Sequence, residues 1–183
     1  MNYEDLKFDC RHFKGEVPCA PNKIRGKVCG TCDEYSPVSK RILIIKLGAA
    51  GDVIRTTPLA FRFKKEFPGC HITWVTNSPD VLPPLQIDSI RTFDFINLFT
   101  LGHQHFDIAI NLDKDREACV LLNEVNASKK YGFYWNKTHI DTVNPESKHK
   151  LLTGAFDSLS KENKKSYQEE IFEICGLKFN KEP

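Results

Sequence analysis

Short runs of apolar and β-branched residues alternate along this chain with segments whose apolar residues recur every three or four positions. The runs are typical of strands in a buried sheet, and they lie at 42–45, 71–76, 89–93, 106–112 and 129–133. The helical spacing is clearest at Leu59–Phe67 and Asp115–Val125. Strands that alternate with helices predict an α/β domain from residue 41 onward, with a mostly parallel sheet covered on both faces.

The remaining segments of this domain have weaker signals. Ser166–Cys175 begins with a Ser-x-x-Glu capping-box pattern and ends before Gly176, which predicts a helix. Asn136–Lys150 is polar and predicts a long loop. Short helices are expected at Asp80–Leu85 and Leu151–Leu159, whereas Asp94–Leu101 fits no single pattern.

Residues 1–40 form a distinct segment that lacks a long periodic pattern and is rich in Cys, Gly and Pro. Its cysteines follow the spacing Cys-x8-Cys-x9-Cys-x2-Cys and are Cys10, Cys19, Cys29 and Cys32. Four thiolates suit tetrahedral zinc, and the same set could hold an iron–sulfur cluster or remain as free or oxidised thiols. His12 could replace one thiolate. We expect a structural zinc site that orders this segment.

Composition limits the cellular compartments and the classes of binding partner that are expected. The chain has 183 residues, of which 40% are hydrophobic and 27% charged, as expected of a globular protein. The formal net charge of +2 argues against a nucleic-acid partner. No apolar run approaches the roughly 18 residues of a membrane span, and the polar, acidic N-terminus does not resemble a secretory signal. We therefore expect a cytoplasmic protein, in which a tight cysteine cluster more often marks a metal site than disulfides.

The stretch Arg41–Leu59 contains the main candidate for chemistry. Its apolar strand leads through the loop Leu-Gly-Ala-Ala-Gly to Asp52, at the strand end where α/β domains bind ligands. The loop lacks the Gly-x-Gly-x-x-Gly fingerprint of dinucleotide sites. Asp52 is either a helix N-cap or a general base, which requires a direct hydrogen bond to the hydroxyl that it activates.

Four segments resemble, in consistent order, the motifs of glycosyltransferase family 9, the lipopolysaccharide heptosyltransferases. Residues 42–58, Ile-Leu-Ile-Ile-Lys-Leu-Gly-Ala-Ala-Gly-Asp-Val-Ile-Arg-Thr-Thr-Pro, are similar to the opening strand and loop of that family. Residues 67–76, Phe-Pro-Gly-Cys-His-Ile-Thr-Trp-Val-Thr, are similar to its second strand. Residues 106–113, Phe-Asp-Ile-Ala-Ile-Asn-Leu-Asp, resemble its Phe-Asp-x-x-Ile-Asp-Leu-Gln segment, with Asn111 and Asp113 as departures. Residues 130–133, Lys-Tyr-Gly-Phe, resemble its Arg-x-Gly-Phe strand.

The resemblance implies that residues 41–183 are a Rossmann-like acceptor-binding domain, the N-terminal half of a GT-B fold. It implies an inverting transfer from a nucleotide-sugar similar to ADP-heptose to a lipopolysaccharide core acceptor, at the inner face of the cytoplasmic membrane and without a metal at the chemistry. A complete GT-B enzyme also has a donor-binding domain, which we expect to lie outside this chain. The isolated chain is therefore not expected to transfer sugar.

The resemblance also assigns roles to residues. Asp52 matches the catalytic base of the family, and Lys46 matches the first-strand Lys that lies beside substrate phosphates. Lys46 could instead be a solvated residue at the strand end, and the residues after the fourth strand could form a solvent-facing helical turn. The remaining candidates for substrate contact lie in the loop and in the segments after the first and fourth strands, and they are Gly48, Gly51, Arg55, Thr56, Thr57, Asp113, Lys114 and Arg116.

Two functions from other classes remain open. The cysteine segment could be a metal-knuckle module that binds a partner protein, with the α/β part as an inactive scaffold. The chain could also be an unrelated nucleotide-binding Rossmann enzyme, although the missing glycine fingerprint disfavours this.

Overall fold

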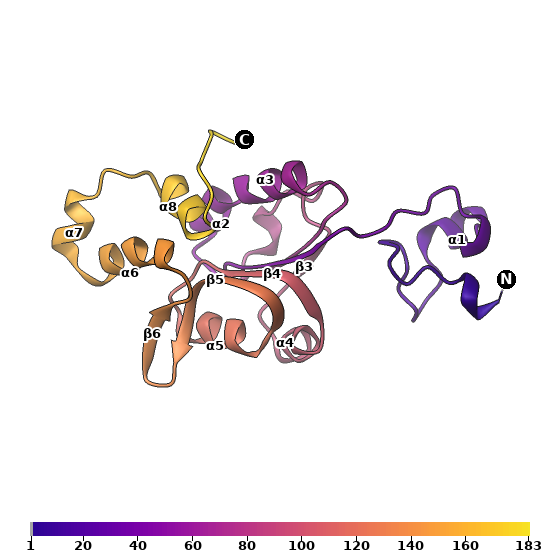
Figure 1. Ribbon diagram of the computed structural model, residues 1–183, viewed down its shortest axis with the longest axis horizontal. Coiled ribbons are helices and arrows are strands. Elements are labelled where there is room, and N and C mark those ends of the chain that lie inside the picture. Colours follow the sequence, from indigo (N-terminus) through magenta and orange to yellow (C-terminus); the bar gives the residue numbers. More distant parts are fainter. Residues whose placement is uncertain (1) are drawn as a thin grey trace.

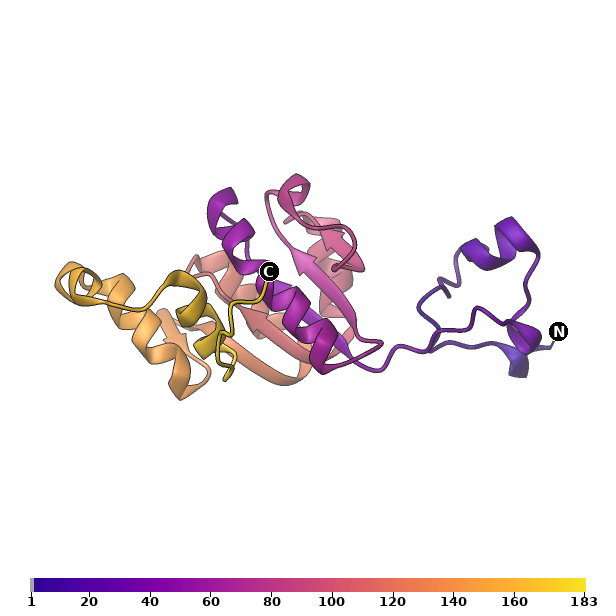
Figure 2. The same ribbon diagram turned by 90° about the horizontal axis from the view of Figure 1, so that it is seen from above.

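The computed structural model describes residues 2–183, which form an α/β domain and a small N-terminal module set apart from it (Figures 1 and 2). The module, residues 2–40, contains the helix α1 (Ala20–Arg25) and two 3-10 turns, Tyr3–Asp5 and Cys29–Thr31. The strands of the α/β domain are β1 (Arg41–Ile45), β2 (His71–Val75), β3 (Ser89–Arg91), β4 (His105–Asn111), β5 (Asn126–Asn136) and β6 (His139–Thr142). Its helices are α2 (Ala50–Thr56), α3 (Pro58–Glu66), α4 (Phe95–Gly102), α5 (Arg116–Glu124), α6 (Lys148–Ala155), α7 (Asp157–Glu162) and α8 (Tyr167–Ile174), with 3-10 turns at Pro79–Val81 and Pro145–Ser147.

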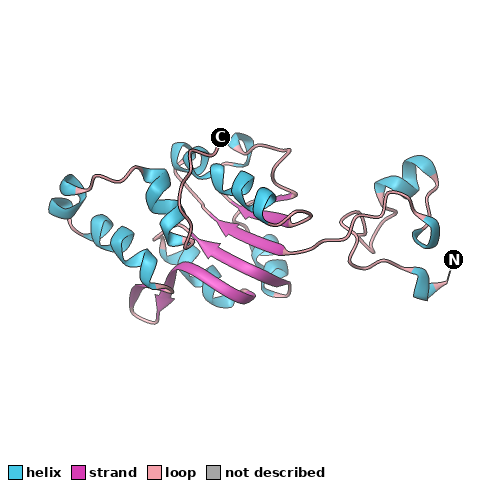
Figure 3. Ribbon diagram, turned by 45° about the horizontal axis from the view of Figure 1, so that its top comes forward, coloured by secondary structure: helices cyan, strands magenta, loops and turns pink. Residues whose placement is uncertain are grey.

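The six strands form one sheet in the order β3-β2-β1-β4-β5-β6 (Figure 3). All neighbouring strands are parallel except β6, which pairs antiparallel with β5. β1 lies in the middle, where Ile44 pairs with Trp74 on one side and with Ile110 on the other. The predicted α/β fold with a mostly parallel sheet is confirmed.

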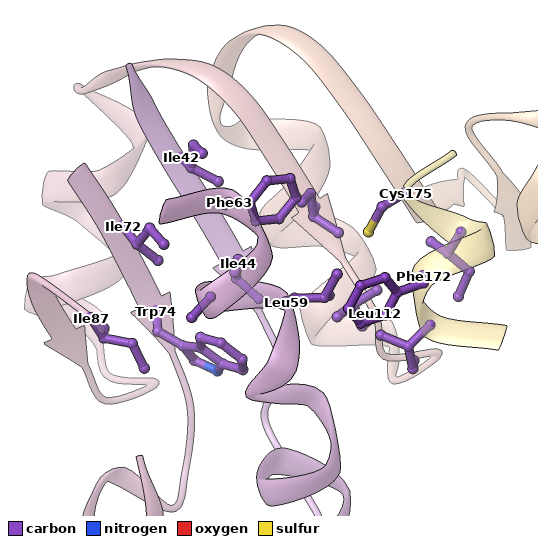
Figure 4. Packing of buried hydrophobic residues seen from close by; sticks show 14 of the residues in the cluster. Ile42, Ile44, Leu59, Phe63, Ile72, Trp74, Ile87, Leu112, Phe172 and Cys175 are labelled. Atoms are coloured by element: carbon purple, nitrogen blue, oxygen red, sulfur yellow. The ribbon is translucent and has the colours of Figure 1, made fainter. Parts of the chain in front are cut away.

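Each face of the sheet has its own core, because alternate residues of a strand point to opposite faces. On one face Ile42 and Ile44 pack with Phe63 of α3 and Phe172 of α8 (Figure 4). On the other face Leu43 and Ile45 pack with residues of α4 and α5, among them Leu101 and Leu122. β1 is buried on both faces, as its unbroken apolar run predicts.

One helix was not predicted, and one prediction about the elements is wrong. Ala50–Thr56 forms the helix α2 between the loop after β1 and the predicted helix α3. Residues 136–150 are not one long loop, since the chain turns back through β6 and enters α6 at Lys148. β6 forms because it pairs antiparallel with β5. The polar composition of this segment does not indicate such pairing.

The backbone geometry explains why the motif Lys-Tyr-Gly-Phe has a glycine, Gly132, at its third position. Gly132 has φ +95°, and a Cβ atom at this position would lie 1.8 Å from the carbonyl oxygen of Asn111, its partner on β4. Only glycine allows β5 to approach β4 this closely.

The N-terminal module contacts the α/β domain through Arg11. Its guanidinium donates to Asp88 Oδ1 at 2.8 Å and to the carbonyl oxygen of Gly69 at 3.0 Å. Asp88, just before β3, also accepts hydrogen bonds from Lys64 and from the amide of Ile72. The Asp88 carboxylate, whose side chain is 17% exposed, therefore joins the module, α3 and β2.

Asp88 gives a testable pH dependence. Burial acts to raise the pKa of this carboxyl, but the hydrogen bonds from Lys64 and Ile72 and the charge of Lys64 hold it below its ordinary value. Because the folded pKa is the lower one, the stabilisation is present above an unfolded value of about 3.9 and is lost as the pH falls through the folded pKa. We expect Asp88→Asn to lower the free energy of unfolding by about 1–3 kcal/mol at pH 7 and by much less at pH 3.

Urea unfolding of the two proteins at both pH values measures this difference. Asp80→Asn is the matched control, because Asp80 is exposed and is expected to leave stability unchanged at either pH. An equal loss for Asp88→Asn at both pH values would contradict the ionic origin of the stabilisation.

Candidate functional site

The candidate site lies beyond the carboxyl end of the central strand β1. The chain leaves β1 through Lys46 and Leu47, passes Gly48, and enters α2 with Asp52 in its first turn. The N-cap of α2 is Ala49, and no side-chain cap is present. The N-cap interpretation of Asp52 is therefore wrong.

Asp52 lies between two cations. Its Oδ1 accepts a hydrogen bond from the guanidinium of Arg55, one turn further along α2. Its Oδ2 is 4.0 Å from Nζ of Lys46, beyond hydrogen-bond distance. The side chain of Asp52 is 34% exposed, whereas that of Lys46 is 4% exposed. The carboxylate is thus open to solvent on one side and faces a buried positive charge on the other.

A buried ion pair between Lys46 and Asp113 holds Lys46 next to Asp52. Nζ of Lys46 donates to Asp113 Oδ1 and to the carbonyl oxygen of Gly48, and the amide of Leu47 donates to Asp113 Oδ2. Burial acts to raise the pKa of Asp113, and the nearby charge of Lys46 opposes this effect. Asn111 fixes Asp113 in turn, because its Oδ1 accepts from the amide of Asp113.

Asp113, Lys46 and Thr56 are the buried candidates, and their contact with a substrate stays a prediction. Both carboxylate oxygens of Asp113 accept hydrogen bonds from the loop after β1, so Asp113 holds Lys46 in place. Nζ of Lys46 points to Asp113 and Gly48 and is nearly buried. Thr56 is fully buried, and its hydroxyl donates to the carbonyl oxygen of Asp52. These residues shape the site from within.

The other loop and α2 candidates remain accessible. An added Cβ at Gly48 or Gly51 would have no atom within 4 Å, so both glycines border open space. The side chain of Arg55 is 51% exposed. Thr57 is half-buried, and its hydroxyl donates to the carbonyl oxygen of Ile54. Contact of these residues with a substrate stays a prediction.

The two basic candidates after β4 contact α6 and β5. Lys114 reaches α6, where its Nζ lies 3.5 Å from the carbonyl oxygen of Lys150, and burial followed by the charge of Lys150 lowers its pKa. The guanidinium of Arg116 lies over the ring of Trp135, 4.8 Å from its centroid. A direct role of either residue in binding stays a prediction.

Tyr167 and Lys150 belong to the site but were not identified from the sequence. The ring of Tyr167, at the start of α8, has the guanidinium of Arg55 at 4.3 Å and Nζ of Lys150 at 5.1 Å from its centroid. Lys150 also pairs with the buried Glu170. Burial raises the pKa of Tyr167, which keeps its phenol neutral. The helix itself was predicted, but sequence alone does not show that it packs against α2.

The four cysteines of the N-terminal module come together around one pocket. Cys10, Cys19, Cys29 and Cys32 all line it, and His12 does as well. Within residues 2–183, however, no three His, Cys, Asp or Glu side chains are gathered closely enough to form a ready metal site. The four predicted ligands therefore line one pocket, but their side chains are not arranged in coordination geometry.

The described part of the chain contains no helix of the length and apolar character that a membrane crossing requires.

Comparison with known proteins gives partial structural matches. No protein-family model matches the sequence, and no curated protein matches it. Solved structures that are similar include a glycosyl transferase family 9 structure from Veillonella parvula, with 27% identity over 51% of this chain and 31% of that chain and a TM-score of 0.41. The E. coli heptosyltransferase WaaC with ADP matches at 16% identity over 78% of this chain and 48% of that chain, with a TM-score of 0.41.

The same E. coli enzyme with ADP-2-deoxy-2-fluoro heptose matches at 16% identity over 78% of this chain, with a TM-score of 0.44. This chain covers 31% of the Veillonella parvula chain and 48% and 50% of the two E. coli chains. Structural similarity to glycosyltransferase family 9 thus extends over part of the chain, which spans half or less of the structures that it matches.

Proposed function

We propose that this chain is the acceptor-side domain of an inverting, heptosyltransferase-like glycosyltransferase in which Asp52 is the general base. One observation carries the proposal. The Asp52 carboxylate stands beyond the carboxyl end of β1, partly exposed, with Oδ1 held by Arg55 and Oδ2 free of a hydrogen bond to the neighbouring Lys46. The ordered family motifs in the sequence support the same assignment.

The proposed reaction is a single displacement. Oδ2 of Asp52 accepts the proton of an acceptor hydroxyl, and the oxygen of that hydroxyl attacks the anomeric carbon of the donor. The bond between that carbon and the phosphate oxygen breaks, and the electron pair leaves with the nucleotide diphosphate. Because attack and departure occur on opposite faces, the product has the inverted anomeric configuration. The donor, similar to ADP-heptose, is bound by a domain that faces Asp52.

Cations around the base suit an anionic acceptor. Arg55 presents an exposed guanidinium beside Asp52. Both Arg55 and Lys150 lie over the ring of Tyr167. Phosphate or carboxylate groups of a lipopolysaccharide core are ligands for such cations. Lys46 contributes a fixed buried charge next to the base, and fixed charges in a site with little water act strongly on reacting groups.

The test is a transfer assay with the protein that carries this chain. ADP-heptose and other nucleotide-sugars are offered with a lipopolysaccharide inner-core acceptor, and the product is examined by mass spectrometry and NMR. We expect sugar transfer with inversion at the anomeric carbon. Retention of configuration, or hydrolysis of the donor without transfer to any acceptor, would contradict the proposal.

A further inference from the structure

We propose that the N-terminal module is built around one zinc ion bound by the thiolates of Cys10, Cys19, Cys29 and Cys32. The four side chains line a single pocket of about 30 Å³. They come from three separate parts of the module. Cys10 forms a β-bridge with Pro37, Cys19 is the N-cap of α1, and Cys29 begins the 3-10 turn that Cys32 follows.

The module has almost no hydrophobic core to hold it together. Among residues 2–40, Pro21 is the one buried residue. The ion pairs Arg25–Glu34 and Lys27–Asp33 lie at the surface, where such pairs contribute little to stability. Segments of this size without a core fold when disulfides or a metal join distant parts of the chain.

The chemistry around the pocket favours a metal over disulfides. Four sulfur ligands suit tetrahedral zinc, and Cys29-x2-Cys32 has the spacing of a zinc knuckle. Four thiolates on Zn²⁺ carry a net charge of −2, and Lys7 and Lys27 line the same pocket. These cations offset the negative charge of such a centre.

Binding requires a small local rearrangement. The four cysteines line the pocket, but no three ligand side chains of residues 2–183 are gathered at coordination distance. Cysteine side chains move between staggered rotamers, and metal binding requires such rotations to bring the sulfurs together. The other cysteines, Cys70, Cys119 and Cys175, are buried in the α/β domain and do not line this pocket.

The zinc centre fixes the contact between the module and the α/β domain. Arg11 directly follows Cys10, and its Nε donates to Ser36 Oγ at 3.1 Å while its Nη atoms bind Asp88 and the carbonyl oxygen of Gly69. A ligand bond at Cys10 therefore holds the backbone from which Arg11 reaches Asp88.

Metal analysis of the purified full chain tests the proposal. We expect one zinc ion per chain by elemental analysis, released when a mercurial reagent titrates the thiols. Cobalt(II) substitution should give the thiolate charge-transfer absorption of four sulfur ligands. Iron with acid-labile sulfide in place of zinc, or a metal-free chain with disulfides among the four cysteines, would overturn the proposal.

Variants identify the ligands. Cys29→Ser/Cys32→Ser should abolish zinc binding, whereas His12→Ala and Cys175→Ala should retain one zinc per chain. Zinc loss in His12→Ala, or full zinc content in the double serine variant, would contradict the four-thiolate set. Limited trypsin digestion gives a second readout. Chelation should speed cleavage within residues 2–40 of the unmodified chain and leave the α/β domain intact, and an unchanged cleavage rate would contradict the structural role.

Discussion

Asp52→Asn is expected to slow sugar transfer by about 100- to 10,000-fold, the contribution that a positioned general base makes. The amide of Asn cannot take the acceptor proton, although its shape and its place in the first turn of α2 are the same. Its oxygen can still accept a hydrogen bond from Arg55, so the local structure should persist. Acceptor affinity should therefore change little while kcat falls.

The measurement compares kcat and KM for the variant and the unaltered protein, with acceptor binding followed separately by calorimetry. Asp157→Asn is the matched control, because Asp157 is also a carboxylate in the first turn of a helix and is exposed on α7. It should retain full activity. Transfer by Asp52→Asn within about tenfold of the unaltered protein would remove Asp52 from the role of base.

The strand pattern was predictable because buried parallel strands leave a strong local signal. β1 is apolar at every position from Ile42 to Ile45 and is buried on both faces. α3 was predictable for a similar reason, since Pro58 occupies its first turn and Phe63 lies on its buried face. Each of these signals is contained within a few neighbouring residues.

The contacts that the sequence does not show have a different origin. Asp113 is a candidate because residues after a strand usually border the ligand site. Its carboxylate also pairs with Lys46, 67 positions earlier in the chain, and this pairing was not predicted. The contributions of Tyr167 and Lys150 likewise depend on α8 packing against α2. Long-range contacts of this kind have no periodicity or spacing that a single sequence can show.

Asp113→Asn is expected to lower the free energy of unfolding by about 3–5 kcal/mol, because the buried ammonium of Lys46 loses its hydrogen-bonded counter-charge and keeps only the more distant, partly exposed carboxylate of Asp52. The Asn oxygen can still accept the hydrogen bond from the amide of Leu47, but the NH2 group then faces the ammonium of Lys46, so the loss includes this hydrogen bond as well as the charge. The side chain of Lys46 is only 4% exposed, and water therefore cannot replace the carboxylate. Urea unfolding followed by tryptophan fluorescence measures the change.

A double-mutant cycle separates stability from catalysis. Lys46→Met/Asp113→Asn removes both charges and should recover part of the stability that Asp113→Asn loses, since no unpaired charge remains buried. Transfer activity should stay low in the double variant, because the fixed positive charge 4.0 Å from Asp52 Oδ2 is gone. If the double variant regained both stability and activity, Lys46 would serve only the packing of the loop. If Asp113→Asn cost less than about 1 kcal/mol, the ammonium would be reaching solvent and the pair could not be the buried support of the site.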